Sequence, residues 1–247
     1  MTKKTWLIFG ALCIALLGGL VYMSRNNKID VSQVDANAVQ KASDQNGNIA
    51  DHTYGNMSSK VILIEYGDYQ CPGCGSIYPV IKQVTEKYKD KMGFIFRNYP
   101  LYTAHPNAFA ASSAAEAAGL QGKYWEMHDK LYTNQSAWNQ LTGSARTEYF
   151  VSAANEIGAN GAALQSQLDN PSIKRKIDVD EALGKKAGVT GTPSLYINGR
   201  SVGDQDVKDG ALIPSDNDSS TQPVWAKVET LENLVIIPAL KSAGIAV

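Results

Sequence analysis

The stretch VILIEYGDYQCPGC, residues 61–74, decides the fold of this chain. Its first six residues are apolar or aromatic except for Glu65, a composition typical of a buried strand. Apolar residues then recur at three- and four-residue steps from Ile77 to Tyr88, which predicts a helix, and residues 93–98 predict a second strand. A strand, a helix and a strand within about 38 residues form a βαβ unit, so the two strands should be parallel.

The rest of the chain has mainly helical character, with strand character returning near its end. Alanine and long side chains dominate between His105 and Lys186, and we expect helices there at 105–119, 122–134, 145–157, 160–169 and 171–186. Residues 194–197 and 200–202 predict two strands joined by an Asn198-Gly199 hairpin turn. Residues 204–223 are polar and rich in turn residues, which predicts an exposed loop, and residues 224–243 predict a last helix.

These elements predict an α/β fold in which the hairpin joins the sheet of the βαβ unit. The α/β domain then consists of residues 49–103 and 187–247, and residues 104–186 form an inserted all-helical domain. Residues 26–48 are polar and contain few large apolar side chains, so we expect a flexible linker there.

Residues 1–25 predict a membrane anchor or a signal segment. Eighteen residues without charge, Trp6–Met23, follow Lys3 and Lys4, and as a helix they span about 27 Å, near the lower limit for crossing a bilayer. We favour an uncleaved transmembrane helix over a cleaved signal peptide, because the small-x-small sequence at residues 36–38 lies too far downstream to be the cleavage site. The rest of the chain would then lie on the extracytoplasmic side of the membrane, at the cell surface or in the periplasm.

The composition excludes several classes of function. The chain has 247 residues, 44% of them hydrophobic and 19% charged, as in a folded protein. Lys and Arg total 23 and Asp and Glu total 24, and the resulting net charge of −1 argues against a nucleic-acid partner. Three cysteines cannot form a scaffold of several disulfides.

Cys71-Pro72-Gly73-Cys74 lies where the first strand meets the helix, and such a pair beside a βαβ unit indicates redox chemistry. Unpaired N–H groups at a helix N-terminus stabilise a thiolate, so we expect a lowered pKa at Cys71. Cys74 lies one turn further on, close enough to form a disulfide with Cys71. A metal site is disfavoured because zinc needs about four ligands and the chain has no second cysteine pair. An inert structural disulfide is the other alternative, although so short a loop constrains little unfolded chain.

Two further sequence features contain candidate functional residues. Glu65 interrupts an apolar strand six residues before Cys71. It either faces water at a sheet edge or is a partly buried carboxylate with a raised pKa, which could exchange protons with Cys74. Thr192-Pro193 precedes the strand at 194–197, and Pro193 is either a proline that simply begins a strand or part of a special turn, sometimes cis.

Residues 64–74, IEYGDYQCPGC, resemble the active-site region of the DsbA-like thiol-disulfide oxidoreductases, and the element order is similar over about residues 50–245. The resemblance implies a thioredoxin fold with a helical insertion, of the membrane-anchored or secreted bacterial type. It implies that Cys71 is the nucleophile and that Cys74 is the resolving cysteine. It also implies that Pro193 is a cis-proline, that Thr192 contacts the substrate backbone, and that Glu65 is the acidic residue near the cysteines. The chain differs at Gly73, where the best-known oxidases of the family have a histidine that helps to stabilise the thiolate.

We therefore expect an extracytoplasmic thiol-disulfide oxidoreductase that donates its Cys71–Cys74 disulfide to cysteine-containing exported proteins. The resemblance implies that a quinone-linked membrane thiol oxidase reoxidises it, and we expect no cofactor, metal or nucleic acid. Two alternatives remain open. One is a disulfide reductase or isomerase that uses the same site, and the other is a non-enzymatic binding module with a thioredoxin fold.

Overall fold

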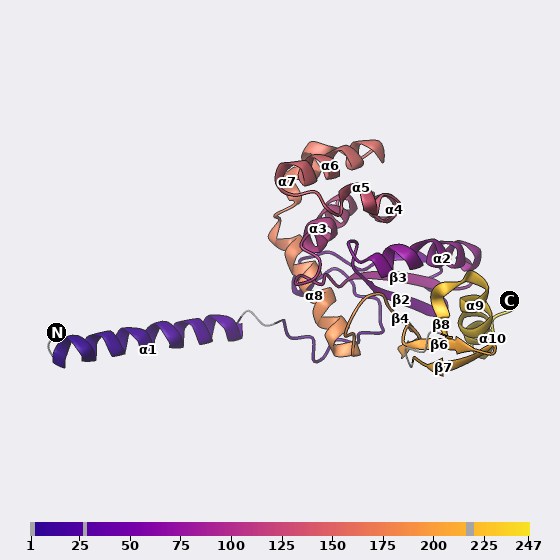
Figure 1. Cartoon of the computed structure of the whole chain (residues 1–247), viewed down its shortest axis with the longest axis horizontal. Helices are drawn as coiled ribbons and strands as arrows, with labels where there is room; N and C mark the ends of the chain where they lie inside the picture. Colours follow the sequence, from indigo (N-terminus) through magenta and orange to yellow (C-terminus); the bar gives the residue numbers. More distant parts are fainter. Residues whose placement is uncertain (1–2, 27–28, 216–219) are drawn as a thin grey trace. The chain divides into compact units, whose positions relative to one another are not determined.

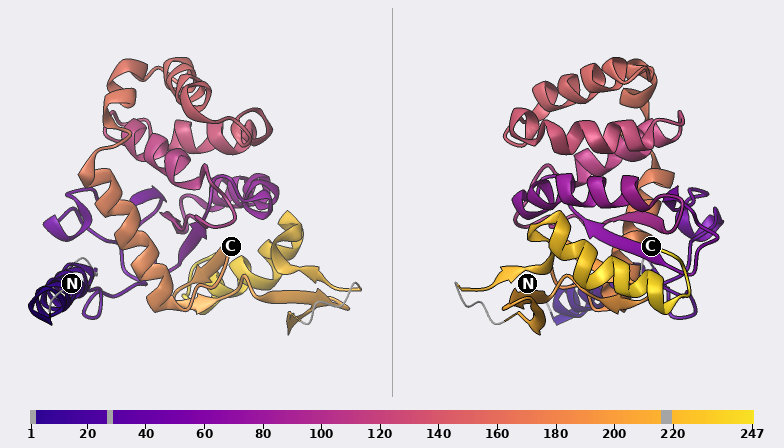
Figure 2. Two further views of the ribbon diagram at one scale, coloured as in Figure 1. Left: turned by 60° about the vertical axis from the view of Figure 1, so that its left-hand side comes forward. Right: turned by 90° about the vertical axis from the view of Figure 1, so that its right-hand side faces the viewer.

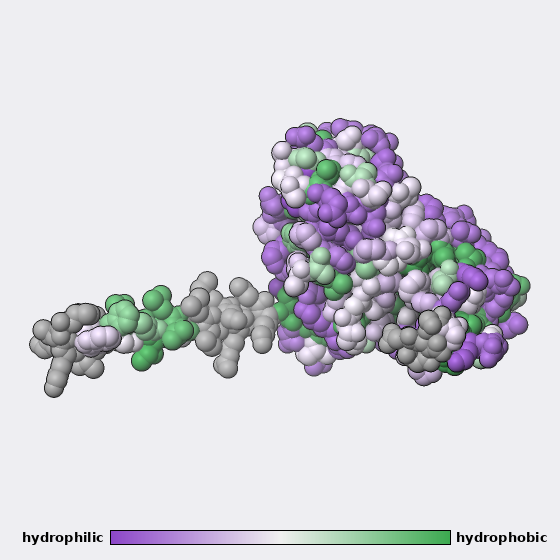
Figure 3. All heavy atoms as spheres, in the orientation of Figure 1, coloured by the Kyte–Doolittle hydropathy of each residue, from purple (hydrophilic) through white to green (hydrophobic). Residues whose placement is uncertain are grey.

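The computed structural model describes residues 3–26, 29–215 and 220–247, and the chain divides into two units, Met1–Gln33 and Val34–Val247. The first unit contains helix α1 (Lys3–Asn26; Figure 1), whose exposed side chains include Leu12 and Ile14. Figure 3 shows hydrophobic residues on the surface of part of this helix. The prediction of an N-terminal transmembrane helix is wrong, because no helix in the described ranges is long and apolar enough to cross a membrane.

The second unit is built on a five-stranded sheet with the strand order β1-β3-β2-β4-β5. Its strands are β1 (His52–Gly55), β2 (Ile62–Gly67), β3 (Gly93–Asn98), β4 (Ser194–Ile197) and β5 (Arg200–Ser201). Strands β2 and β3 are parallel, which confirms the predicted βαβ unit, and β4 runs antiparallel to β2. Strand β1, which the sequence did not predict, pairs antiparallel with β3 at the sheet edge. The strand that contains Glu65 is therefore the central one.

Helix α2 (Pro72–Tyr88) connects β2 to β3, and a run of helices separates β3 from β4. These helices are α3 (Ala108–Gly119), α4 (Tyr124–Thr133), α5 (Gln135–Trp138), α6 (Gly143–Glu156), α7 (Gly161–Gln167) and α8 (Pro171–Ala187). All but α5 match predicted helices to within about three residues at each end, as expected for boundaries read from sequence. Figure 2 shows α3–α7 stacked on the α2 side of the sheet, with α8 running from that block past the sheet.

A second, three-stranded sheet occupies part of residues 204–223, so the prediction of an exposed loop there is wrong. Its strands are β6 (Gln205–Lys208), β7 (Ala211–Pro214) and β8 (Gln222–Pro223), and residues 216–219 of the predicted loop lie outside the described residues. The buried Asp206 carboxylate accepts hydrogen bonds from the Ser215 hydroxyl at 2.9 Å and the Thr221 hydroxyl at 3.1 Å. Because a polar residue faces inward here, the sequence lacks the apolar alternation that indicates a strand.

The predicted helix at 224–243 is interrupted, which corrects that prediction as well. It consists of a 3-10 turn η2 (Val224–Ala226), helix α9 (Val228–Leu231), a π-helical turn η3 (Glu232–Ile236) and helix α10 (Ile237–Ser242). Lys227 is extended between η2 and α9, with φ of −138°. Pro238 has no N–H group, so it cannot donate the helical hydrogen bond to the carbonyl four residues before it. The π-helical turn η3 lies just before this missing hydrogen bond.

Arg97, which is fully buried in β3, holds the chain that precedes the sheet. Its guanidinium donates to the carbonyl oxygens of Ala36 and Ala38, the second at 2.7 Å, and forms a 2.7 Å ion pair with Asp51. The ammonium group of Lys176, in α8, lies 3.1 Å from the same carboxylate. Part of the predicted linker at 26–48 is thus bonded to the domain, while its residues 27–28 lie outside the described residues.

Candidate active site

Cys71 caps the N-terminus of helix α2 and lies just after the end of strand β2 at Gly67. Its backbone is extended, with φ of −66° and ψ of 124°, and its carbonyl accepts the Gly75 N–H at 3.0 Å. Pro72 occupies the first helical turn, where its missing N–H breaks no helical hydrogen bond. The Cys71 sulfur is therefore close to the unpaired N–H groups of a helix N-terminus, as the sequence predicted.

The loop that contains Thr192 and Pro193 lies beside the two cysteines. The Thr192-Pro193 peptide bond is cis, and the Cys71 sulfur lies 3.3 Å from the Thr192 carbonyl oxygen. A Cβ atom at Gly73 would lie 3.2 Å from Pro193 Cδ and 3.6 Å from the Cys71 sulfur. The tertiary structure thus brings together residues far apart in the chain, and the absence of a side chain at Gly73 lets the two loops approach closely.

The pKa of the Cys71 thiol is lowered to about 5. The main cause is a hydrogen bond from the Cys74 thiol, which favours the thiolate form of Cys71. Burial opposes this effect, while the Thr192 side chain and the N–H groups of Cys74 and Gly73 add to it. Cys71 is therefore a thiolate at neutral pH, although the histidine of the best-known family members is absent.

Cys74 differs from Cys71 in both exposure and protonation. It is fully buried, and burial raises its pKa well above the usual value for a thiol. Its sulfur accepts a hydrogen bond from the Asp68 N–H at 3.5 Å. Neither cysteine forms a disulfide in this structure, and Cys71, with 6% of its surface exposed, is the more accessible of the two.

Glu65 lies on the central strand of the sheet with only 2% of its surface exposed. Burial raises the pKa of its carboxyl to about 8, and the nearby negative charge of Cys71 contributes in the same direction. Of the two alternatives that the sequence left open, the structure excludes the position at a water-facing edge. A carboxyl with this pKa is mostly protonated at neutral pH and can act as a proton donor.

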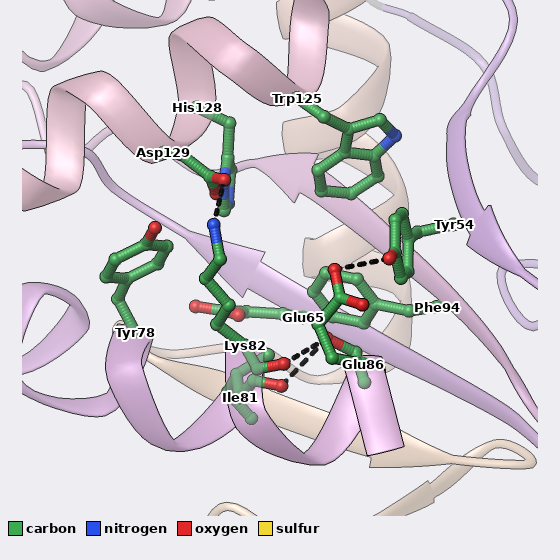
Figure 4. A pocket seen from close by; sticks show the side chains of 11 residues that line it. Tyr54, Glu65, Tyr78, Ile81, Lys82, Glu86, Phe94, Trp125, His128 and Asp129 are labelled. Carbon is green, nitrogen blue, oxygen red and sulfur yellow. Dashed lines mark hydrogen bonds and ion pairs between the residues drawn. The ribbon is translucent and has the colours of Figure 1, made fainter. Parts of the chain in front are cut away.

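A pocket of about 50 Å³ lies beside Glu65 (Figure 4). Figure 4 shows the Lys82 side chain reaching across this pocket to Asp129, with which it forms an ion pair. Both of these side chains are partly exposed to solvent, and the buried His128 also lines the space. The pocket is large enough to admit water, so it provides a route by which Glu65 can exchange its proton with solvent.

Side chains that the sequence did not single out hold the loop that precedes α2. The Gln135 amide, in α5, donates to the carbonyl oxygens of Tyr69 at 2.8 Å and Cys71 at 2.9 Å. The Gln70 amide donates to the Asn139 carbonyl at 2.6 Å. The segment between β3 and β4 therefore helps to position Cys71.

The buried Asp68 carboxylate also holds the loop before α2, through several hydrogen bonds. It accepts the N–H groups of Gln70 at 2.8 Å and Leu101 at 2.9 Å, and it lies 2.7 Å from Nδ1 of His105. Asp68 and Gln70 lie in the sequence between the apolar strand and the cysteine pair. Their polar side chains in that position were the sequence signal that could have identified them as part of the site. Gln135 had none, because it lies 64 residues from Cys71 along the chain.

Comparison with known proteins identifies the family. Residues 47–211, more than half of the chain, match the sequence model of the family described as thioredoxin. The chain belongs to the thioredoxin family. The matched range includes residues 64–74 and confirms the thioredoxin fold that the resemblance implied.

Solved structures share the fold of this thioredoxin-family protein. Oxidised BdbD from Bacillus subtilis superposes with a TM-score of 0.60 and 18% identity, covering 83% of this chain and 98% of that one. Wolbachia pipientis α-DsbA1 gives a TM-score of 0.59 and 22% identity, covering 78% of this chain and 92% of that one. The thioredoxin fold, together with the family, supports thiol-disulfide oxidoreductase activity in general.

The curated relatives that the thioredoxin-family chain matches are longer proteins. A Na(+)/H(+) antiporter, NhaA 1, from Mycolicibacterium gilvum is 32% identical over 150 residues, which are 61% of this chain and 24% of the relative. The chain thus spans about a quarter of the length of the curated relatives it matches.

Proposed function

We propose that this protein is an extracytoplasmic disulfide donor that oxidises pairs of thiols in exported proteins through Cys71 and Cys74. The observation that carries the proposal is the Cys71 sulfur at the N-terminus of α2, with a thiol pKa of about 5, in front of the buried Cys74. Stabilising this thiolate stabilises the reduced protein relative to its disulfide. A dithiol whose reduced form is stabilised makes its disulfide a stronger oxidant.

The first step transfers the disulfide to the substrate. A substrate thiolate attacks the Cys71 sulfur of the Cys71–Cys74 disulfide; the bond between substrate and Cys71 forms, and the Cys71–Cys74 bond breaks. Cys74 leaves with the electron pair, and Glu65, whose pKa is about 8, supplies the proton that makes Cys74 a thiol. The Glu65 carboxylate then takes a proton from solvent by way of the pocket beside it.

The second step releases the oxidised substrate. Another substrate thiolate attacks the substrate sulfur of the mixed disulfide, so the substrate disulfide forms and Cys71 leaves as a thiolate. A low pKa makes Cys71 a good leaving group. Two substrate thiols have then been oxidised, and the cysteine pair of the protein has been reduced.

A polar groove next to the nucleophile suits an extended segment of the substrate. It has a volume of about 330 Å³ and is lined by residues that include Thr192, Pro193 and Ser194. We place the substrate backbone against Thr192 and Pro193, the residues that the family resemblance assigns to this contact. The groove adjoins Cys71, because the Cys71 sulfur lies 3.3 Å from the carbonyl oxygen of Thr192, one of the residues that line the groove.

The compartment and the partners follow from the direction of the chemistry. Disulfides persist in oxidising compartments, so we propose that the substrates are cysteine-containing proteins outside the cytoplasm. Each turnover leaves Cys71 and Cys74 reduced, and an oxidant must restore the disulfide. We propose a quinone-linked membrane thiol oxidase for this role, as the family resemblance implies.

The reduction potential of the Cys71–Cys74 pair tests the direction of the reaction. We expect a value nearer about −120 mV than about −270 mV, measured by equilibration with glutathione. A potential near the lower value would contradict the donor role and favour a disulfide reductase that uses the same site.

Trapping of mixed disulfides tests the activity itself. The Cys74→Ala variant cannot resolve a disulfide between Cys71 and a substrate. Its Cys71 thiolate should therefore accumulate covalent complexes with test proteins that contain a disulfide, because attack on that disulfide bonds one substrate sulfur to Cys71 and releases the other as a thiolate. Cys13→Ser is the matched control, because Cys13 lies in α1 outside the site, and this variant should behave as the wild type. Absence of complexes with Cys74→Ala, and no thiol oxidation by the wild type, would leave only the non-enzymatic binding module.

A further inference from the structure

Tyr132, on helix α4, carries a buried hydroxyl that has no hydrogen-bond partner within the described residues. The tyrosine is 5% exposed, so water does not satisfy the hydroxyl freely. A buried polar group without a partner destabilises the fold. Such a group is retained most readily where it meets an acceptor at another step of the protein's cycle.

The hydroxyl of Tyr132 lies over strand β2. A Cβ atom at Gly67 would stand 3.1 Å from the Tyr132 oxygen and 2.4 Å from the ring of Phe96. Gly67 and Glu65 lie on the same face of β2 because side chains alternate along a strand, and Phe96 is the residue paired with Glu65 in the sheet. The Tyr132 hydroxyl is therefore on the face of the sheet that carries Glu65.

The sulfur of Cys74 lies at the same end of β2. It accepts the N–H of Asp68, the residue that follows Gly67. Burial raises the pKa of Tyr132 well above its usual value, and the charges of Cys74 and Glu65 are the largest electrostatic contributions to that rise. The three groups thus cluster around residues 65–68.

Neighbouring rings hold Tyr132 in place. Its ring centroid lies 5.0 Å from that of Tyr69 and 5.3 Å from that of Tyr78, with which it is stacked. The Tyr69 hydroxyl donates to the Tyr124 hydroxyl at 3.2 Å, whereas the Tyr132 hydroxyl has no partner among the described residues.

We propose that Tyr132 is a further catalytic residue, whose hydroxyl donates a hydrogen bond to the Cys74 sulfur when that sulfur leaves as a thiolate. The inference rests on the proposed function, because it concerns the step in which a substrate thiolate bonds to Cys71. As the Cys71–Cys74 bond breaks, the electron pair goes to Cys74, and the Tyr132 hydroxyl stabilises the developing charge. Glu65 then transfers its proton to Cys74, which leaves a neutral thiol, a carboxylate and an unchanged tyrosine.

The test is the Tyr132→Phe variant of the full chain, in its oxidised form, mixed with excess reduced glutathione. We expect the rate of mixed-disulfide formation to fall by about ten- to a hundredfold, the loss typical of one hydrogen bond to a charged group. The equilibrium constant with glutathione should change less than twofold, because both stable redox states lack the thiolate at Cys74. The unfolding temperature should stay the same or rise, since the variant removes an unsatisfied buried hydroxyl.

Tyr149→Phe is the matched control. Its hydroxyl, on α6, is also without a partner in the described part of the chain, and its removal should leave the rate unchanged. An active wild type with an equal rate in Tyr132→Phe would overturn the inference and leave the proposed function intact. A slower rate accompanied by an equal shift of the equilibrium constant, or by a lower unfolding temperature, would also overturn it. A wild type that exchanges no disulfide would overturn the proposed function and this inference together.

Discussion

The side-chain amide of Gln135 donates a hydrogen bond to the backbone carbonyl of Cys71 at 2.9 Å. The same amide binds the Tyr69 carbonyl at 2.8 Å, so one residue of α5 holds the loop on both sides of Gln70. The short helix α5, which follows β3 in the chain, thus helps to fix the backbone position of Cys71. The geometry of Cys71 depends on long-range contacts as well as on its own helix.

Replacing Gln135 should loosen this loop. The Gln135→Ala variant removes two hydrogen bonds, so we expect the free energy of unfolding to fall by about 1–3 kcal/mol and disulfide exchange to slow. Urea denaturation and a thiol-oxidation assay measure the two effects. The exposed Gln83, on α2, provides the control, and Gln83→Ala should change stability by less than about 0.5 kcal/mol. Equal stability of the two variants would contradict the prediction.

The thiol of Cys74 should control the acidity of Cys71. Cys74→Ala removes the hydrogen bond that is the main cause of the low pKa, so the pKa of Cys71 should rise from about 5 towards the usual thiol value. Cys74→Ser keeps a hydroxyl donor at the same place and should raise the pKa less. Ultraviolet absorbance of the thiolate as a function of pH, in a Cys13→Ser background, measures all three proteins. Identical titrations would show that the helix N-terminus alone sets the pKa.

Glu65 should make stability depend on pH in a predictable direction. Its pKa is about 8 in the folded protein, against an ordinary value of 4.5, so the folded state binds the extra proton between these pH values. The stability of the wild type relative to Glu65→Gln should therefore fall as the pH rises from about 4.5 to 8, by an amount on the order of 4 kcal/mol. Denaturation at a series of pH values checks this slope.

Glu86→Gln is the control for that experiment. Glu86 lines the same pocket but is half-exposed, so its replacement should not reproduce the pH dependence. A wild type and a Glu65→Gln variant whose stabilities run parallel across this range would show that Glu65 is not held as a neutral carboxyl.

Gly67 should tolerate no side chain. A Cβ atom there would lie 2.4 and 2.6 Å from two ring carbons of Phe96, which packs within the core. We expect Gly67→Ala to cost about 1–3 kcal/mol of stability because it overpacks this contact. Gly191→Ala is the matched control, since a Cβ atom at Gly191 meets no atom within 4 Å. Chemical denaturation should show a lower free energy of unfolding for Gly67→Ala than for Gly191→Ala, and equal values for the two variants would contradict the prediction.

Local patterns in the sequence predicted most of the sheet and helices. The buried strand at 61–66, the helix after Cys71 and the parallel strand at 93–98 are each indicated by residues close together in the chain, and the structure confirms them. The second sheet escaped prediction because Asp206 faces inward and its strands are short. One local signal was present there: Asp209-Gly210 has positive φ at both residues, 50° and 77°, as in a tight hairpin turn. The N-terminal segment was misread because an uncharged run alone does not define a transmembrane helix.

By itself, the sequence determined the family, the βαβ unit and the place of Cys71 at the start of a helix, because each depends on neighbouring residues and on backbone geometry that every helix shares. Only the tertiary structure decided that Glu65 is buried on the central strand, that Gln135 bonds to the loop before α2, and that the Tyr132 hydroxyl lies near Gly67 at the end of β2. It also decided that the chain around Ala36 is bonded to Arg97. These relationships join residues far apart in the sequence, and burial and hydrogen bonding across such distances arise only when the whole domain packs.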